Sequence, residues 1–200
     1  LEELGTDLVF HPDPAELYFP DAATWVEVPA LAKNLCAKTR PTHFRGVCTV
    51  VSKLFHIAAP DKAFFGQKDA QQLAVIRRMV RDLNFDLEIV GCPIVREADG
   101  LAMSSRNTYL NPKERQAALV LNRSLKKGEA LIEAGETDTN KLLAVIKESI
   151  AAEPLAKLDY AEAVDADSMK PVATVEGNVL FAIAVYIGKT RLIDNFLVSR

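Results

Sequence analysis

Apolar residues recur with helical spacing from Val47 to Ala58, and Pro60 ends this segment. The chain then alternates between short apolar runs and a second helical pattern. The expected elements are a short buried strand over Lys62–Phe65, a helix from about Asp69, and a strand over Leu87–Val90. Strand, helix and strand at this spacing predict a βαβ unit with a parallel sheet and a right-handed crossover.

Pro93 marks a change in the pattern. The expected elements beyond it are two helices, Lys113–Ala134 and Thr139–Ala152, and three strands, Leu158–Val164, Asn178–Ile187 and Thr190–Leu197. Asp138 is a candidate N-cap for the second helix, and Gly188-Lys189 joins the last two strands. Helices followed by a run of strands predict a small α+β domain over residues 94–200, after an α/β domain over residues 1–93.

The first residues read as the tail of a helix, which Gly5 would cap. Leu8–Phe10 would be a strand after it, and Trp25–Val28 also alternates like a strand. Because a domain seldom begins at the end of a helix, we expect that a segment upstream of Leu1 has been removed.

Composition narrows the class of protein. The 200 residues are 49% hydrophobic and 26% charged, as in ordinary soluble globular proteins. The formal net charge of -3 argues against a nucleic-acid partner. No apolar run reaches the length of a membrane span, and no signal peptide is visible, so we expect a cytoplasmic protein. Cys36, Cys48 and Cys92 lack the spacing of a metal site and read as reduced thiols.

The first candidate site follows the strand that ends near Phe65. Gly66 would let a ligand approach the backbone, and the next helix would offer free N–H groups to an anion. Lys68 could meet a phosphate, and Asp69 could bind ribose hydroxyls or a metal, or merely cap the helix. Gln72 lies one turn further on and should face the same region. The spacing alone is weak evidence, because this arrangement is common.

The second candidate is the segment Asp99–Asn107. An Asp-Gly turn leads into Ser104, Ser105 and Arg106, whose hydroxyls and guanidinium could wrap a polyphosphate. A surface turn whose serines cap the local backbone is an equally good interpretation.

His43 and Arg45 form a third, smaller cluster before a helix, where they could help to bind an anion. A lone histidine is more often structural, so His43 is a weak candidate for contacting a phosphate or a carboxylate substrate. His11 and His56 have no acid–base partner nearby and are assigned to structure.

Several stretches occur together and in order. They are His43–Val47, Phe65–Leu73, Ile89–Arg96, Met103–Asn107 and Ala184–Asn195. This ordered set strongly resembles the pantothenate synthetase family, also called pantoate–β-alanine ligase. Gln72, together with His43–Gly46, favours this family over other adenylating enzymes of the same superfamily.

The resemblance implies a Rossmann-like fold of the nucleotidylyltransferase type with a smaller C-terminal domain that closes over the site. It also implies condensation of pantoate with β-alanine, using ATP and Mg²⁺, through a pantoyl adenylate with release of AMP and pyrophosphate. Members are usually homodimers. Adenylation relies mainly on positioning and on electrostatic stabilisation of the phosphates.

The resemblance assigns roles to residues of both candidate sites. Those implied to bind ATP are Gly66, Gln67, Lys68, Asp69, Val95, Met103, Ser104, Ser105 and Arg106. Gly66 and Asp69 would lie near the ribose, Val95 and Met103 would present backbone to the adenine, and Lys68, Ser104, Ser105 and Arg106 would act on the phosphates. Gln72 would bind pantoate, and His43 is a weaker candidate for it.

The family's His-x-Gly-His motif does not occur among the 200 residues. The chain therefore resembles the family with an N-terminally truncated Rossmann-like domain, and we expect impaired activity. The alternative hypothesis is a non-catalytic nucleotide-binding or dimerising module derived from such an enzyme.

Overall fold

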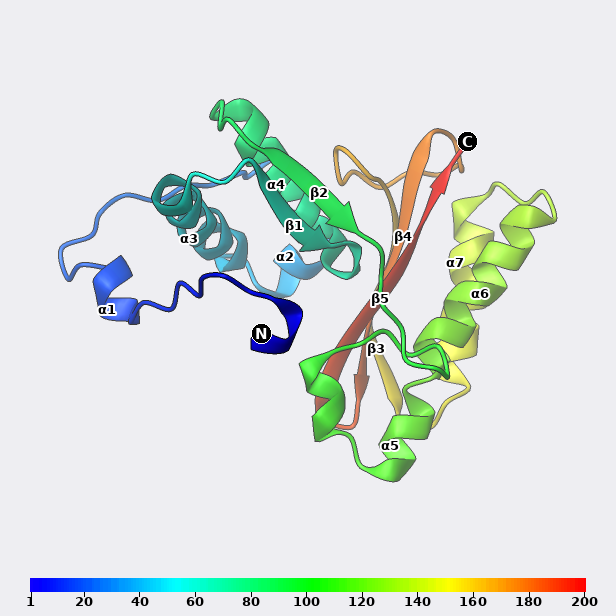
Figure 1. Ribbon diagram of the computed structural model, residues 1–200. Coiled ribbons are helices and arrows are strands. Elements are labelled where there is room, and N and C mark those ends of the chain that lie inside the picture. Colours follow the sequence, from blue (N-terminus) through cyan, green and yellow to red (C-terminus); the bar gives the residue numbers. More distant parts are fainter.

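The βαβ unit forms as its periodicity predicts. In the computed structural model, which describes residues 1–200, β1 (Lys62–Gly66) pairs in parallel with β2 (Glu88–Cys92), and α4 (Ala70–Asp82) connects them. The preceding helix, α3 (His43–Ala58), packs beside α4 (Figure 1). The helix α3 begins at His43, so His43–Gly46 form its first turn rather than part of the loop expected before it.

The prediction that β1 is a buried strand was wrong. Exposure alternates along it, and Phe64 is 66% exposed, whereas Ala63 and Phe65 pack against the core. Helices cover one face of this two-stranded sheet, so alternate side chains of β1 point away from the protein core.

The C-terminal half contains three helices and one antiparallel sheet. The helices are α5 (Pro112–Ala117), α6 (Val120–Glu133) and α7 (Thr139–Ala151), and the strands are β3 (Ala156–Asp165), β4 (Asn178–Ile187) and β5 (Thr190–Ser199), in the order β3-β4-β5. Gly188, at φ +56°, turns the chain between β4 and β5. Asp138 caps α7 as predicted, because its Oδ1 accepts a hydrogen bond of 2.8 Å from the Asn140 N–H.

The single helix expected over Lys113–Ala134 was wrong, because the structure divides it into α5 and α6. The chain tightens at the junction, where the Leu119 N–H donates to the Gln116 carbonyl only three residues back. Bonds of this type commonly end a helix.

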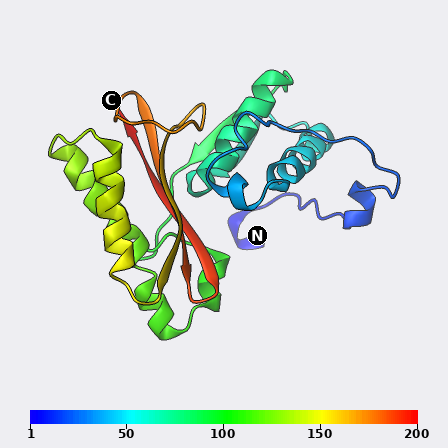
Figure 2. The same cartoon turned by 180° about the vertical axis from the view of Figure 1, so that it is seen from behind.

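The β3–β5 sheet lies between two groups of helices (Figures 1 and 2), and it separates two hydrophobic cores. One core lies between the sheet and α6 and α7, and the other lies between its opposite face and α3 and α4. Strand β4 supplies both. Val179, Phe181 and Ile183 belong to the first core, whereas Leu180 and Ala182 belong to the second. This alternation follows from the two-residue repeat of a strand.

The first 40 residues contain only short helices, namely η1 (Glu2–Leu4), α1 (Pro14–Leu17) and α2 (Cys36–Thr39). Gly5 ends η1 at φ 68°, as a left-handed cap. The strands expected at Leu8–Phe10 and Trp25–Val28 were wrong, because neither segment meets a partner strand. Leu8 is 82% exposed, and the Val26 N–H donates to the Thr49 hydroxyl instead of to a ladder.

No helix of this structure is both long enough and apolar enough to cross a bilayer. All three cysteines are free, and burial raises the pKa of the Cys48 thiol to about 11.

Candidate functional site

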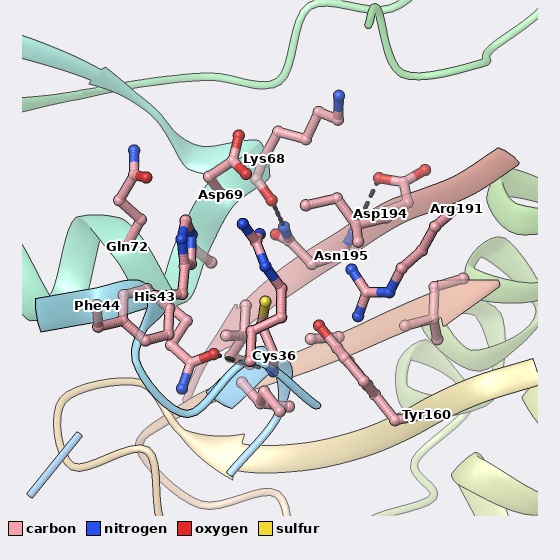
Figure 3. Close-up of a pocket in the computed structure, with 18 of the residues that line it drawn as sticks. Cys36, His43, Phe44, Lys68, Asp69, Gln72, Tyr160, Arg191, Asp194 and Asn195 are labelled. Carbon is pink, nitrogen blue, oxygen red and sulfur yellow. Dashed lines mark hydrogen bonds between the residues drawn. The ribbon is translucent and has the colours of Figure 1, made fainter. Parts of the chain in front are cut away.

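A cavity of about 270 Å³ lies between the helices of the N-terminal half and the β3–β5 sheet (Figure 3). Five residues that the sequence singled out line it: His43, Lys68, Asp69, Gln72 and Arg106. They come from α3, from the turn after β1, from the first turn of α4 and from η3 (Ser105–Tyr109). The two candidate stretches therefore meet at one cavity, although more than 30 residues separate them in the sequence.

The turn after β1 carries the first stretch. Gly66 ends the strand, and Gln67–Asp69 form the short helix η2, which leads into α4. Gly66 has an ordinary φ of -70°, and a Cβ added there would meet no atom within 4 Å. The chain's own packing therefore does not require glycine at this position, which leaves an open backbone surface.

Lys68 links the two stretches directly. Its side chain is half-buried at the cavity wall, and its Nζ donates to the Met103 carbonyl at 3.0 Å. Burial lowers the pKa of Lys68, the Arg106 charge lowers it further, and the Asp69 carboxylate opposes this shift. A lysine with a partly desolvated ammonium beside a second cation is well placed to gain from an anionic ligand.

The second stretch begins with a tight turn. Gly100 adopts φ +95°, and a Cβ there would lie 2.8 Å from the Asn122 Oδ1, so glycine is required. The turn brings Met103 back to Val95, whose carbonyl accepts the Met103 N–H at 2.9 Å. Val95 and Met103 are 65% and 54% exposed, but neither lines the main cavity.

Ser104, Ser105 and Arg106 differ in what they contact. The Ser104 hydroxyl accepts from the Arg106 N–H at 3.2 Å and caps η3, as the local-capping interpretation predicts. The Arg106 side chain lines the cavity and is absent from the ion pairs of the chain, whereas neither serine lines it. In this arrangement Arg106 is the cavity-facing member of the three.

A polar network fixes the base of this loop. Arg115 pairs with Glu97 at 2.6 Å and with Asp99 at 2.8 Å. Asn107 donates to Glu97 at 2.7 Å and to the Ala102 carbonyl at 3.2 Å. The hydrogen bonds from Arg115 and Asn107 lower the pKa of Glu97, which keeps the carboxylate ionised within the network.

His43 faces the cavity from the start of α3, but Arg45 does not line it. Burial lowers the pKa of His43, the Arg40 charge lowers it further, and Asp69 acts in the opposite direction. Arg45 pairs with Glu27 at 3.4 Å and lies 4.9 Å from the centre of the Trp25 ring. Arg45 therefore has a structural contact rather than a place in the site.

Several cavity residues were not singled out from the sequence. Arg40 contributes another cation, while Tyr160, Arg191, Asp194 and Asn195 come from the β3–β5 sheet (Figure 3). Arg191 pairs with Asp159 at 2.8 Å. Asp194 and Asn195 are buried polar residues within the otherwise apolar segment 192–198 of β5, and that break in the pattern is the signal that could have found them.

The cavity suits an anionic ligand, because the cationic side chains of Lys68, Arg106 and Arg40 line it. No cluster of three or more His, Cys, Asp or Glu side chains is arranged to hold a metal ion. Asp69 is an exposed carboxylate at the wall, whereas Asp194 is occupied by Arg96.

The chain matches known proteins along almost its whole length. A family model described as pantoate-beta-alanine ligase matches residues 1–197. Pantothenate synthetase of Clostridium novyi (strain NT) is 60% identical over 193 residues, which are 96% of this chain and 68% of that protein. Its counterpart from Heliobacterium modesticaldum is 58% identical over 198 residues, which are 99% of this chain and 70% of that protein.

Solved structures agree with these matches. The crystal structure of pantothenate synthetase from Thermus thermophilus superposes with a TM-score of 0.91 at 42% identity, covering 98% of this chain and 71% of that one. Pantoate-beta-alanine ligase from Francisella tularensis, complexed with beta-gamma ATP and β-alanine, gives a TM-score of 0.74 at 30% identity. That match covers 98% of this chain and 66% of the other. These structures confirm the predicted α/β fold class.

Proposed function

The chain belongs to the pantoate–β-alanine ligase family, and we propose that its cavity is the part of the site that binds ATP and pantoate. The observation that carries this proposal is the convergence of Lys68, Asp69, Gln72 and Arg106 on one cavity from two separate stretches. The crystal structure of the Francisella relative in complex with an ATP compound and β-alanine supports the choice of ligands.

The reaction that we propose has two steps. A carboxylate oxygen of pantoate forms a bond to the α-phosphorus of ATP, the bond from that phosphorus to the β-phosphate oxygen breaks, and pyrophosphate leaves. The β-alanine amine then attacks the acyl carbonyl, the bond to AMP breaks, and the amine loses a proton. No protein nucleophile is required.

Lys68 and Arg106 supply the electrostatic part of the first step in this proposal. Negative charge grows on the phosphates as pyrophosphate departs, and cations already fixed at the cavity wall stabilise that charge. The Lys68 ammonium would exchange its bond to the Met103 carbonyl for a phosphate oxygen. Ser104 and Ser105 would add hydroxyl donors, and the Ser104 hydroxyl can donate its hydrogen while its oxygen still accepts the Arg106 N–H.

The remaining assignments rest on position. Gly66, Gln67 and Asp69 would lie along the ribose side, and Val95 and Met103 would flank the adenine. Gln72 would hold pantoate from the first turn of α4, with His43 opposite on α3. We propose that Mg²⁺ enters with the nucleotide, since magnesium is usually held by substrate phosphates and one or two carboxylates. Asp69 is the carboxylate available for this role.

Division into units over residues 1–93 and 94–200 is also part of the proposal. The core beside α6 and α7 supports it, because all of its buried residues lie between Leu101 and Phe196. A homodimer and a cytoplasmic location are further predictions, and sedimentation of the purified chain would test the first.

Calorimetric titration of the 200-residue chain with ATP and Mg²⁺ tests the site. Lys68→Met should weaken ATP binding about tenfold to hundredfold, the range that a lost charge-assisted hydrogen bond of ~1.5–3 kcal/mol predicts. The matched control is Lys62→Met, which removes an exposed lysine paired with Glu88 at the far end of β1. Equal affinities for both variants would contradict the proposed site.

Product formation separates the two candidate functions. Both the ligase and a nucleotide-binding module predict ATP binding, whereas the ligase alone predicts pantothenate from labelled β-alanine. Since no His-x-Gly-His occurs among these 200 residues, we expect slow turnover by this chain alone. A rate equal to that of a full-length relative would contradict that expectation.

A further inference from the structure

The side chain of Asn195 holds the turn that carries Lys68. Its Nδ2 donates to the Lys68 carbonyl at 2.9 Å (Figure 3) and to the Gln67 carbonyl at 3.1 Å. Asn195 lies on β5 and is only 6% exposed. An asparagine that gives both amide hydrogens to consecutive carbonyls fixes the orientation of that turn, because moving either carbonyl would leave a buried donor without a partner.

The neighbouring residue, Asp194, reaches the other candidate stretch. Its buried carboxylate accepts two hydrogen bonds from Arg96, at 2.7 and 3.0 Å. Its Oδ1 also accepts the Asn195 N–H at 2.8 Å. The Arg96 Nη1 donates in addition to the Gly100 carbonyl at 3.1 Å, so the same guanidinium fixes the Asp99-Gly100 turn. Removing Arg96 would leave the Asp194 carboxylate buried without its charged partner, which would destabilise the folded protein.

These contacts close into a ring. From Arg96 the backbone continues to Val95, whose carbonyl accepts the Met103 N–H, and the Met103 carbonyl accepts the Lys68 ammonium at 3.0 Å. The ring therefore runs from the turn at Lys68 through Met103 and Arg96 to β5, and back through Asn195 to the Lys68 carbonyl. It contains one contact, from Lys68 to Met103, that a bound phosphate would break.

We propose that Asp194 and Asn195 are positioning residues that hold the Gly66–Asp69 turn and the Val95–Arg106 loop in one relative arrangement. The inference rests on the proposed function only where it concerns ATP. When the ammonium of Lys68 leaves Met103 for a phosphate, the Asn195 amide and the Arg96–Asp194 pair still hold both stretches. The cations of the site therefore stay aligned during ligand binding, with no new ordering of the backbone.

Hydrogen exchange of the ligand-free 200-residue chain tests this positioning directly. Asn195→Leu removes both donors at similar volume, and Asp194→Asn keeps the shape but removes the charge that Arg96 meets. Each variant should raise amide exchange about tenfold in both stretches, residues 66–69 and 95–106, as expected when local opening becomes easier by ~1.4 kcal/mol. The control is Ile187→Val, which weakens the same sheet where it pairs with Thr190 and Ala156, away from the ring and the cavity.

A merely structural role would give a different pattern. Exchange that rises over the whole sheet, as in Ile187→Val at matched stability, or that rises in only one of the two stretches, would overturn the inference. If Asn195→Leu does not fold, Asp194→Asn still decides the question through the Arg96 side of the ring.

ATP binding provides the second readout. Both ring variants should bind ATP with Mg²⁺ about tenfold more weakly, because a smaller fraction of molecules has the competent arrangement. Ile187→Val should bind ATP like the parent chain. Failure of the parent chain itself to bind ATP would remove the proposed function, while the exchange pattern would still confirm or overturn the positioning role.

Discussion

The two sheets of the molecule differ in how much of their surface is buried. The antiparallel sheet has ten-residue strands, and every residue of β4 from Val179 to Val185 is buried. The parallel sheet has two five-residue strands, and no residue of β1 is fully buried. Both cores pack against the antiparallel sheet, whereas the parallel sheet ends at the turn that carries Lys68 and Asp69. The antiparallel sheet therefore supplies most of the buried core, and it also forms one wall of the cavity.

The strongest test of this contrast truncates one phenylalanine in each sheet. Phe181 is fully buried and stacks on Phe196 with ring centres 4.8 Å apart, whereas Phe64 is 66% exposed. Phe181→Ala should lower the free energy of unfolding by about 3–5 kcal/mol, because it leaves a cavity in the core. Phe64→Ala should change it by less than about 0.5 kcal/mol. Urea denaturation followed by circular dichroism measures both, and similar losses would break the contrast.

Gly66 sharpens the comparison, since its replacement should affect function but not folding. A Cβ at this position meets no atom of the chain, so Gly66→Ala should leave the melting temperature unchanged or slightly raise it. If the nucleotide lies against this backbone, the added methyl group should weaken ATP binding about tenfold, or ~1.4 kcal/mol. Gly46→Ala, on α3 and equally free of neighbours, is the matched control. Unchanged affinity in Gly66→Ala would remove Gly66 from the proposed site.

The smallest expected effect is a change in the pH dependence of stability that comes from His43 at the cavity wall. Burial and the Arg40 charge lower the pKa of His43 in the folded protein, so the unfolded chain binds this proton more readily. The lowered pKa of His43 therefore stabilises the folded protein above pH about 6.5, the pKa of histidine in the unfolded chain. This stabilisation is lost as the pH falls through the pKa of His43 in the folded protein.

His43→Gln removes this titration. Its free energy of unfolding should therefore fall less than that of the parent chain between pH 7 and acid pH, when both are measured by urea denaturation. His56→Gln serves as the control, because His56 lies at the exposed end of α3 against Phe85. Parallel pH profiles for the parent and His43→Gln would contradict the shift.

Local patterns predicted most of the fold. The helical repeat of α4 and the apolar run of β4 are local patterns within each segment, so both elements were located correctly from the sequence. Leu8–Phe10 and Trp25–Val28 have strand-like patterns but no partner, and partners are a non-local property that one sequence does not reveal. The split between α5 and α6 was missed for a related reason, since no proline or glycine marks it.

The candidate site was predictable in part. Glycine, lysine and serine motifs drew attention to the two stretches, and the cavity brings Lys68, Asp69 and Arg106 together. Asn195 was missed because its role depends on two backbone carbonyls more than 120 residues away. The polar pair within an apolar segment marks Asn195 as unusual, but the sequence does not reveal which distant backbone groups its side chain contacts.

Strand β4 imposes an unusual rule on variation in this chain. Odd-numbered positions from Val179 to Ile187 contribute to the core beside α6 and α7, whereas Leu180 and Ala182 contribute to the core beside α3 and α4. A substitution at an odd-numbered position therefore affects the core beside α6 and α7, whereas a substitution of Leu180 or Ala182 affects the core beside α3 and α4. In a redesigned protein, inserting a single residue within β4 would therefore move the side chains that follow it from one core to the other.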